Sequence, residues 1–512
     1  MNADLMRKAL AAASFGVPFV IYMVSLTPSV GFWDTAEMQT VPYILGIAHP
    51  TGFPAFVLLG YLFSHLVAIV NVAWRLSLMS AIAMAAAAWL IFLTLRDEGV
   101  DAMLASLSAW TFAFGSVVWT RGTRAEVHAL VILFIGAAIW AALRARATRA
   151  IAPLYICALA LGLAAATHPV MIWTLPGVAI LLFVGPQGKR RYQARELLLA
   201  GALATAPLLL YLYMPLRSAF VASRGLDPTL ALGLPPGQAF WDWGHPAGWQ
   251  NFVRFVTGGY YPKNGALGAI LHPSSYASLL QTFAERVFDE FGALAIALMV
   301  IGFTSTLLKD RVKALSLALI ALAGVPFALR YTVETDYDRY LLTAYWTLAL
   351  FLGYGAQAIT ASLKVRGRAS IATAVVTVTL LVDVGYIIST NRAAFAQTSD
   401  HTADALIDRT VRQTPDRSIV VASWVYATPL AYGAYVERRL GRRVVISAEP
   451  EELTTLIRQW RAKRPVYLIF FRPLGETVRS LDGLRLIALK DDSPTIYGVA
   501  AIPRGHHQRM RR

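Results

Sequence analysis

The sequence has few charged residues and almost no cysteine. Charged side chains make up 15% of its 512 residues, and hydrophobic ones make up 57%. A soluble fold of this length carries more charge and shorter apolar runs, so the composition predicts a polytopic helical membrane protein. The single cysteine, Cys157, stands inside an apolar run, which excludes a disulfide within the chain and a cysteine-based metal site.

Two further features are missing. No pair of inverted repeats is evident, which weakens the interpretation as a transporter with a site at mid-depth. No glycine-rich phosphate loop precedes the helices expected near the C-terminus, so no nucleotide site is predicted. The formal net charge of +16 does not indicate a nucleic-acid partner, because Lys and Arg gather in short loops between apolar runs.

The basic loops predict the orientation of the apolar runs in a bacterial inner membrane. Arg7 and Lys8 precede the first run, so we expect a cytoplasmic N-terminus and an outer loop at residues 31–54. The later basic clusters face inward only if residues 53–70 form a juxtamembrane helix and not a span. About eleven spans then follow, at residues 9–27, 75–95, 102–120, 126–145, 151–167, 170–185, 196–215, 281–308, 314–331, 338–361 and 369–390.

The chain changes character after about residue 391. Short β-branched runs at 418–423, 444–447 and 466–471 alternate with helical patterns at 427–441 and 449–463. Strands that alternate with helices indicate a small α/β domain with a partly parallel sheet. We therefore expect a transmembrane domain at residues 1–390 and an extracytoplasmic α/β domain at 391–512.

The first outer loop holds an acid pair and a histidine in a rigid turn. Carboxylates at a membrane boundary are costly unless something uses or pairs them, and Asp34 and Glu37 stand there. We predict Asp34 as a catalytic base and Glu37 as its support, although the pair also resembles a helix start capped by Asp34. His49, in His-Pro-Thr-Gly, is predicted to bind a phosphate or orient Asp34, unless it is only a turn residue.

Further cations and histidines are expected at the same outer face. Arginine suits phosphate binding. Two alternatives would also explain these cations: a local ion pair, or a long side chain that extends to the membrane surface. The candidates for binding a donor phosphate or sugar are Arg121, Arg124, Glu126, His168, Arg217, Arg330 and Arg339. The acids Glu334, Asp336 and Asp338 leave room for a divalent cation or an acceptor, but we expect a solvated loop and predict no metal site.

Aromatic residues of the outer loops are candidates for an acceptor or sugar platform. Aromatic faces pack against the C–H faces of sugars, and they also settle at the headgroup level as an ordinary aromatic belt. The candidates are Trp33, Trp241, Trp243, Tyr260 and Tyr261.

Carboxylate, cations and aromatics at one interface fit sugar transfer from a polyprenyl-phosphate carrier to a hydroxyl. That reaction needs a base for the hydroxyl, positive charge for the departing phosphate and a surface for the sugar. The alternative is a non-enzymatic transporter or assembly subunit that binds a lipid-linked sugar without using a base.

The motifs resemble a known family. The segments Trp-Asp-Thr-Ala-Glu (33–37), Gly-Ile-Ala-His-Pro-Thr-Gly-Phe-Pro (46–54), Arg-Ala-Glu-Val-His (124–128), Thr-His-Pro (167–169) and Tyr-Leu-Tyr-Met-Pro-Leu-Arg-Ser (211–218) carry the likeness. They resemble the domain-of-unknown-function family that includes the eukaryotic transmembrane O-mannosyltransferase, within the GT-C superfamily.

The resemblance covers residues from about 10 to 360. It implies an inverting glycosyltransferase with its site on the outer face and juxtamembrane helices in the first outer loop. It also implies that the acidic residue of that loop, Asp34, is the catalytic one. His49 would then lie beside the donor phosphate and Glu126 would face the same cavity. Mannose is the first candidate for the sugar, and protein Ser/Thr, lipid and glycan all remain acceptors to consider.

Overall fold

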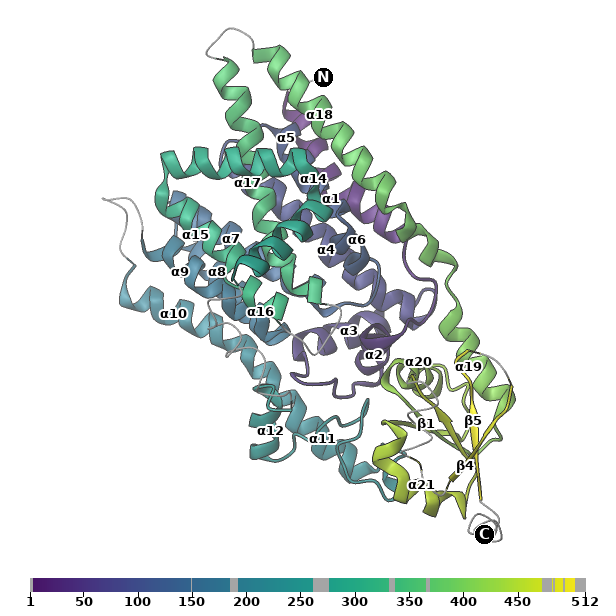
Figure 1. Cartoon of the computed structure of the whole chain (residues 1–512). Helices are drawn as coiled ribbons and strands as arrows, with labels where there is room; N and C mark the ends of the chain where they lie inside the picture. Colours follow the sequence, from purple (N-terminus) through teal and green to yellow (C-terminus); the bar gives the residue numbers. More distant parts are fainter. Residues whose placement is uncertain are drawn as a thin grey trace.

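The computed structural model describes residues 3–148, 150–184, 192–260, 276–330, 337–364, 369–471, 481, 484–490 and 493–501 (Figure 1). The described chain forms a large helical body and a small domain with a β-sheet at one end of it. The start of the first helix lies at the opposite end of the molecule from the sheet.

Among the described residues, the first half of the chain contributes helices and no strands. Its helices are α1 (Ala3–Val24), α2 (Trp33–Ile44), α3 (Pro54–Leu66), α4 (Val72–Asp97), α5 (Ala102–Phe114), α6 (Ser116–Gly122), α7 (Val127–Ala147), α8 (Ala152–Thr167), η1 (Pro169–Thr174), α9 (Leu175–Phe183), α10 (Ala194–Thr205), η2 (Ala206–Leu212), α11 (Tyr213–Arg224), η3 (Leu230–Leu232) and α12 (Trp249–Val256).

The second half completes the helical body and adds the sheet. Its helices are α14 (Tyr276–Lys309), α15 (Arg311–Leu322), α16 (Val325–Arg330), η5 (Tyr337–Leu341), α17 (Leu342–Lys364), α18 (Ala369–Thr390), η6 (Asn391–Ser399), α19 (Thr402–Gln413), α20 (Trp424–Tyr435), η7 (Pro450–Leu453) and α21 (Thr454–Arg461). The strands are β1 (Ile419–Ala422), β2 (Val444–Ser447), β3 (Val466–Ile469), β4 (Leu484–Ala488) and β5 (Tyr497–Ala501).

Each of the eleven expected spans coincides with helical structure, but their number stays a prediction. Seven helices among the described residues are long and apolar enough to cross a membrane, or eight if a bent pair counts as one span. Shorter apolar helices occupy 54–66, 152–167 and 169–183. The run expected as a juxtamembrane helix is therefore a 13-residue helix, α3, which Pro54 opens at the first helical position.

The expected span at residues 102–120 is not straight. α5 and α6 meet at Gly115 with a bend of 74°. Glu290 of α14 accepts hydrogen bonds from the backbone N–H groups of Val117 (2.9 Å) and Val118 (3.2 Å) at the start of α6. A side chain at Gly115 would place its Cβ 2.2 Å from Glu290 Oε1, so it would displace the carboxylate that binds the start of α6. The bend directs α6, which carries Arg121, away from the axis of α5.

Two glycines let α14 and α17 touch along their backbones. A Cβ added at Gly302 would lie 1.8 Å from the carbonyl oxygen of Phe351, and one at Gly355 would lie 1.9 Å from that of Leu298. Small residues at a crossing point allow this close approach, which is a common way to pack helices in membranes.

The C-terminal domain is built around a five-stranded mixed sheet of order β2-β1-β3-β5-β4. β1 pairs in parallel with β2 and β3, whereas β5 runs antiparallel to β3 and β4. The expected small α/β domain with a partly parallel sheet is therefore confirmed, although β4 and β5 were not foreseen. The division at residues 390 and 391 stays a prediction; α18 ends at Thr390.

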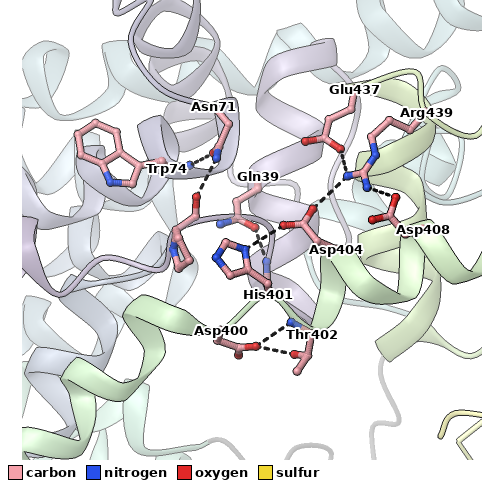
Figure 2. A network of polar contacts seen from close by, with 12 residues as sticks. Gln39, Asn71, Trp74, Asp400, His401, Thr402, Asp404, Asp408, Glu437 and Arg439 are labelled. Atoms are coloured by element: carbon pink, nitrogen blue, oxygen red, sulfur yellow. Dashed lines mark hydrogen bonds and ion pairs between the residues drawn. The ribbon is translucent and has the colours of Figure 1, made fainter. Parts of the chain in front are cut away.

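The C-terminal domain rests on the first-loop helix α2 and the start of α4 (Figure 1). Tyr432 of α20 accepts the backbone N–H of Ala73 at 3.0 Å. Behind this contact, Arg439 binds Asp404 (3.1 Å), Glu437 (2.7 Å) and Asp408. Figure 2 shows this ionic network beside Gln39 of α2 and beside Asn71, which caps α4 by accepting the N–H of Trp74. The network holds α19 and the segment that follows α20 together.

Candidate active site

Asp34 lies on the first turn of α2, and it does not cap that helix. α2 begins at Trp33, and the capping position is held by Phe32 without a side-chain hydrogen bond. The alternative assignment of Asp34 as a helix cap is therefore wrong. Trp33 has a φ of 55°, in the left-handed region that bulky residues rarely adopt. The helix thus begins two residues earlier than the pattern indicates, and the Asp34 carboxylate is left to contact other segments.

Two residues far along the chain hold the carboxylate of Asp34. Arg339 Nη1 donates to its Oδ2 at 3.1 Å, and Trp424 Nε1 donates to its Oδ1 at 3.1 Å. Burial by itself raises the pKa of Asp34, but the charges of His49 and Arg339 outweigh this effect and lower the pKa below its usual value. Asp34 is therefore ionised at neutral pH, while 29% of its side chain stays exposed.

Glu37 and His49 form a second contact of the first loop. The Glu37 side chain is fully buried, and its Oε1 accepts the backbone N–H of His49 at 2.8 Å. Its Oε2 contacts His49 Nδ1 as well. Burial by itself lowers the pKa of His49, but the carboxylates of Glu37 and Asp34 reverse the effect and raise it above its usual value. Glu37 thereby fixes the imidazole beside Asp34 and favours its charged form.

A buried polar group at the start of α7 contributes to the same site. Arg121 Nη1 binds Glu126 Oε2 at 3.1 Å, and His128 Nδ1 contacts Glu126 Oε1 at 2.8 Å. The local ion pair offered as an alternative is thus present, but it is buried and not exposed, since Arg121 and Glu126 are 3% and 6% exposed. Burial raises the pKa of Glu126, yet His128 and Arg121 outweigh it and hold that pKa well below its usual range.

Aromatic rings connect the two groups. His49 contacts Phe53 edge-on with 4.9 Å between ring centroids, and Phe53 stacks on His168 at 5.4 Å. His168 in turn lies 4.7 Å from His128. Tyr340, next to Arg339 in the sequence, contacts the His128 ring edge-on at 5.0 Å. Residues from the first loop, α7, the end of α8 and η5 therefore line one continuous site.

His168 is positioned as a neutral hydrogen-bond donor. Its Nδ1 accepts the backbone N–H of Val170 at 3.0 Å, so the ring proton is assigned to Nε2. Burial is the main cause that holds the pKa of His168 well below its usual value, and the electrostatic effects of His128 and Arg339 lower it further. A neutral imidazole can donate one hydrogen bond to an oxygen without adding charge.

Arg217 supports the first loop and lies outside the group around Asp34. Its guanidinium donates to the carbonyl oxygens of Leu45 (2.6 Å) and Ile44 (3.1 Å) at the end of α2. Helix ends leave such carbonyls without partners, and a cation there is favourable. Its expected role in phosphate binding stays a prediction.

The expected platform aromatics do not gather in one place. Trp33 is 51% exposed beside Asp34, and its ring meets Phe471 of the C-terminal domain at 5.8 Å. Trp241 packs on Tyr435 at 5.6 Å, and Trp243 packs on Tyr260 at 5.8 Å. Only Trp33 among the described candidates thus combines high exposure with direct proximity to Asp34.

For the remaining candidate residues the structure gives less detail. Arg124 is half-buried in the turn between α6 and α7. Arg330 is the last residue of α16, but its side chain lies outside the described part of the structure, as do Tyr261 and the acids Glu334 and Asp336. Asp338 is described and lies 3.7 Å from Arg286.

The spacing of Asp34, Glu37 and His49 would allow a metal ion, because their ligand atoms lie within 4.8 Å of one another. The arrangement does not favour one. Arg339 already binds Asp34, and Glu37 already contacts His49 Nδ1, so these ligand atoms have partners within the protein. Charge within this group is balanced by side chains of the protein.

Trp424 is the site residue that the sequence did not reveal. It is the first residue of α20, directly after β1, in a segment interpreted only as part of the C-terminal domain. One general signal exists: in parallel sheets, functional residues often follow the carboxyl ends of strands. That signal alone does not say which helix of the membrane body such a residue will meet.

The whole chain resembles a solved membrane protein in fold. ArnT from Cupriavidus metallidurans in the apo state superposes with a TM-score of 0.59 over 97% of this chain and 98% of that one, at 12% sequence identity. The same protein bound to undecaprenyl phosphate gives a TM-score of 0.54. The chain is therefore a multi-pass membrane protein with the GT-C-like fold that the sequence predicted, including helices in the first loop and a terminal α/β domain.

Sequence comparison identifies related proteins. Residues 34–191 match the family model described as protein O-mannosyl-transferase TMEM260 N-terminal domain. Protein O-mannosyl-transferase tmem260 of Dictyostelium discoideum is 25% identical over 319 residues, 57% of this chain and 36% of that protein. TMEM260 of Mus musculus is 31% identical over 222 residues, 42% of this chain and 31% of that protein. The family resemblance is thus confirmed, and the chain spans about a third of the length of these relatives.

Proposed function

We propose that this protein is an inverting glycosyltransferase that moves a sugar, with mannose as the first candidate, from a polyprenyl-phosphate carrier to an acceptor hydroxyl. The acceptor oxygen attacks the anomeric carbon and its proton passes to Asp34. The bond from that carbon to the phosphate oxygen breaks, and the phosphate leaves with the electron pair. Attack opposite the leaving group inverts the anomeric configuration.

The observation that carries this proposal is the environment of Asp34. It is a partly exposed, ionised carboxylate in the first loop, oriented by Arg339 and Trp424. A low pKa makes it a weak base, but a weak base suffices because phosphate is a good leaving group and the hydroxyl becomes acidic as the new bond forms. One carboxylate is enough for this chemistry, which gives Glu37 a supporting role through His49.

Donor binding is assigned to the cationic side of the site. Arg339, His49 with its raised pKa and neutral His168 are three hydrogen-bond donors of different kinds, and phosphate oxygens accept hydrogen bonds from each of them. Arg121, which is paired with Glu126, adds a further guanidinium to this part of the site. ArnT is known to bind undecaprenyl phosphate, which supports a polyprenyl-phosphate donor for the similar fold here.

Acceptor binding is assigned to the side that faces the C-terminal domain. Trp33 and Phe471 are 51% and 63% exposed, and their rings form a T-shaped contact next to Asp34. The relatives are protein O-mannosyl-transferases, so we infer a protein hydroxyl as the acceptor. An exposed aromatic pair suits a segment of polypeptide that presents Ser or Thr.

We infer that the site faces the extracytoplasmic side of a bacterial inner membrane. α7 starts at the site with Glu126 as its cap, and its last turn carries Arg144 and Arg146. α4 likewise starts beside α2 and has Arg96 in its last turn. Cytoplasmic ends of spans carry the excess of Lys and Arg, which supports an outer position for the opposite ends. A reporter after residue 391 should therefore be extracytoplasmic.

The decisive experiment uses purified protein with polyprenyl-phosphate [³H]mannose and Ser/Thr peptides. We expect transfer by the wild type and a loss of about 10²–10⁴-fold in Asp34→Asn, the range for removal of a general base. Equal transfer by both proteins would contradict the assignment of Asp34. Counterflow of lipid-linked sugar in vesicles that survives Asp34→Asn, without transfer, would support the transporter alternative instead.

A further inference from the structure

We propose that Trp424 is a positioning residue for Asp34, so that the C-terminal domain contributes directly to the active site. This inference rests on the proposed function, because it assigns a role in the reaction of the same base. Trp424 lies 390 positions from Asp34 in the sequence, yet its indole N–H is hydrogen-bonded to one of the two carboxylate oxygens.

The backbone of Trp424 is fixed by the edge of the sheet. It follows Ser423, whose N–H donates to the carbonyl of Ile469 at the end of β3 (3.0 Å). The Ser423 hydroxyl donates to Glu449 Oε2 (3.1 Å), just after β2, and accepts the N–H of Phe471 (3.2 Å). The start of α20 is thereby tied to the segments that follow both neighbouring strands, which leaves Trp424 little freedom to move.

The ring of Trp424 is fixed as well. It stacks on Phe240, which is 2% exposed, with 5.7 Å between centroids and 4° between the planes. The His49 ring lies perpendicular to it, with 6.3 Å between the ring centroids. Phe240 is in turn pressed against the first loop, because a Cβ at Gly46 would lie 2.0 Å from the Phe240 carbonyl oxygen. The ring is therefore held in one orientation, with its indole N–H pointing toward Asp34.

The bond to Trp424 differs in kind from the bond to Arg339. The charged groups that face Asp34 are His49 and Glu37 from the first loop and Arg339 from η5, and Trp424 adds a neutral donor from α20. With one donor on each oxygen, the carboxylate plane cannot rotate. Without the indole N–H, one oxygen loses its partner, so the carboxylate accepts a proton more readily and is free to turn away from the acceptor.

Trp424→Phe tests this role, since phenylalanine keeps a ring on Phe240 but lacks the N–H. Trp460→Phe is the matched control: Trp460 is another buried tryptophan of the C-terminal domain, and its Nε1–H binds the carbonyl of Leu232 at 2.8 Å. We expect Trp424→Phe to lower kcat about tenfold with both KM values changed less than twofold, and Trp460→Phe to leave kcat unchanged.

A second readout does not depend on how much protein is active. The carboxylate infrared band that disappears in Asp34→Asn is titrated in each protein. We expect its midpoint to rise by about one pH unit in Trp424→Phe, the size expected for one hydrogen bond to a charged group. An unchanged midpoint and kcat would overturn the inference while Asp34→Asn is inactive. Full transfer by Asp34→Asn would overturn the proposed function instead.

Discussion

Glu37 holds His49 through two contacts at once, one to the backbone N–H and one to the ring Nδ1. The acid and the histidine are twelve residues apart, and the turn between them brings the imidazole next to Asp34. The charge state of His49 therefore depends on Glu37, and this dependence can be measured.

Glu37→Gln should change the pH dependence of transfer. In the wild type the pKa of His49 is raised, so the ring keeps its proton to a higher pH than a free imidazole and loses it as the pH rises through that raised value. Removal of the Glu37 charge lowers this pKa, so the alkaline decline of kcat/KM should begin at a lower pH, by about one unit. The control is Asp97→Asn, which breaks an exposed pair with Arg144 in the last turns of α4 and α7. Identical profiles for Glu37→Gln and wild type would show that His49 carries no essential charge.

Trp33→Ala should affect the acceptor more than the donor. The exposed Trp33 ring borders Asp34 and Phe471, and an aromatic contact of this kind contributes about 0.5–1.5 kcal/mol. We expect the KM for the acceptor peptide to rise about three- to tenfold, with the donor KM unchanged. Trp249→Ala, at a tryptophan of α12 that is 76% exposed, serves as the control. A rise in the donor KM alone would move the acceptor to another surface.

Chelation should leave transfer intact. Asp34 is bound to Arg339 and Glu37 to His49, so the carboxylates near the reaction are already compensated by cationic side chains. We expect full activity after dialysis against EDTA, measured with and without added Mg²⁺ or Mn²⁺. Activity that is lost on dialysis and restored by either ion would show that a metal displaces these contacts.

Gly302→Ala should destabilise the helical body. Its new methyl group would overlap the Phe351 carbonyl, so α14 and α17 would have to separate. Overpacking of this kind costs about 1–3 kcal/mol, and we expect a lower midpoint for loss of the monodisperse species on heating in detergent. Gly385→Ala in α18 is the control, because nothing lies within 4 Å of its added Cβ. Equal midpoints for the two variants would mean that the crossing tolerates an added methyl group.

The sequence predicts the helical elements well and the site in part. Long apolar runs and basic loops identify helices directly, because burial in lipid leaves few alternatives for the backbone. Asp34, Glu37 and His49 stand within sixteen residues, so their proximity could be foreseen. Arg339 was one of several cations considered, and nothing in the sequence singled it out as the partner of Asp34.

The remaining features depend on contacts between distant segments. Trp424 reaches Asp34 only because α20 docks on α2, and no periodicity records this docking. The bend at Gly115 requires Glu290, which lies on another helix. β4 and β5 are short strands at one edge of the sheet, and their pairing with β3 is set by tertiary structure more than by their own composition.

The long sequence separation within the site has a consequence for biosynthesis. Arg339 and Trp424 are made 305 and 390 residues after Asp34. At about 5–20 residues per second, a ribosome needs about 20–80 s to go from Asp34 to Trp424. Asp34 thus reaches the membrane well before Arg339 or Trp424 has been synthesised. We expect nascent chains to be inactive toward the lipid-linked sugar until the last domain has folded against the first loop.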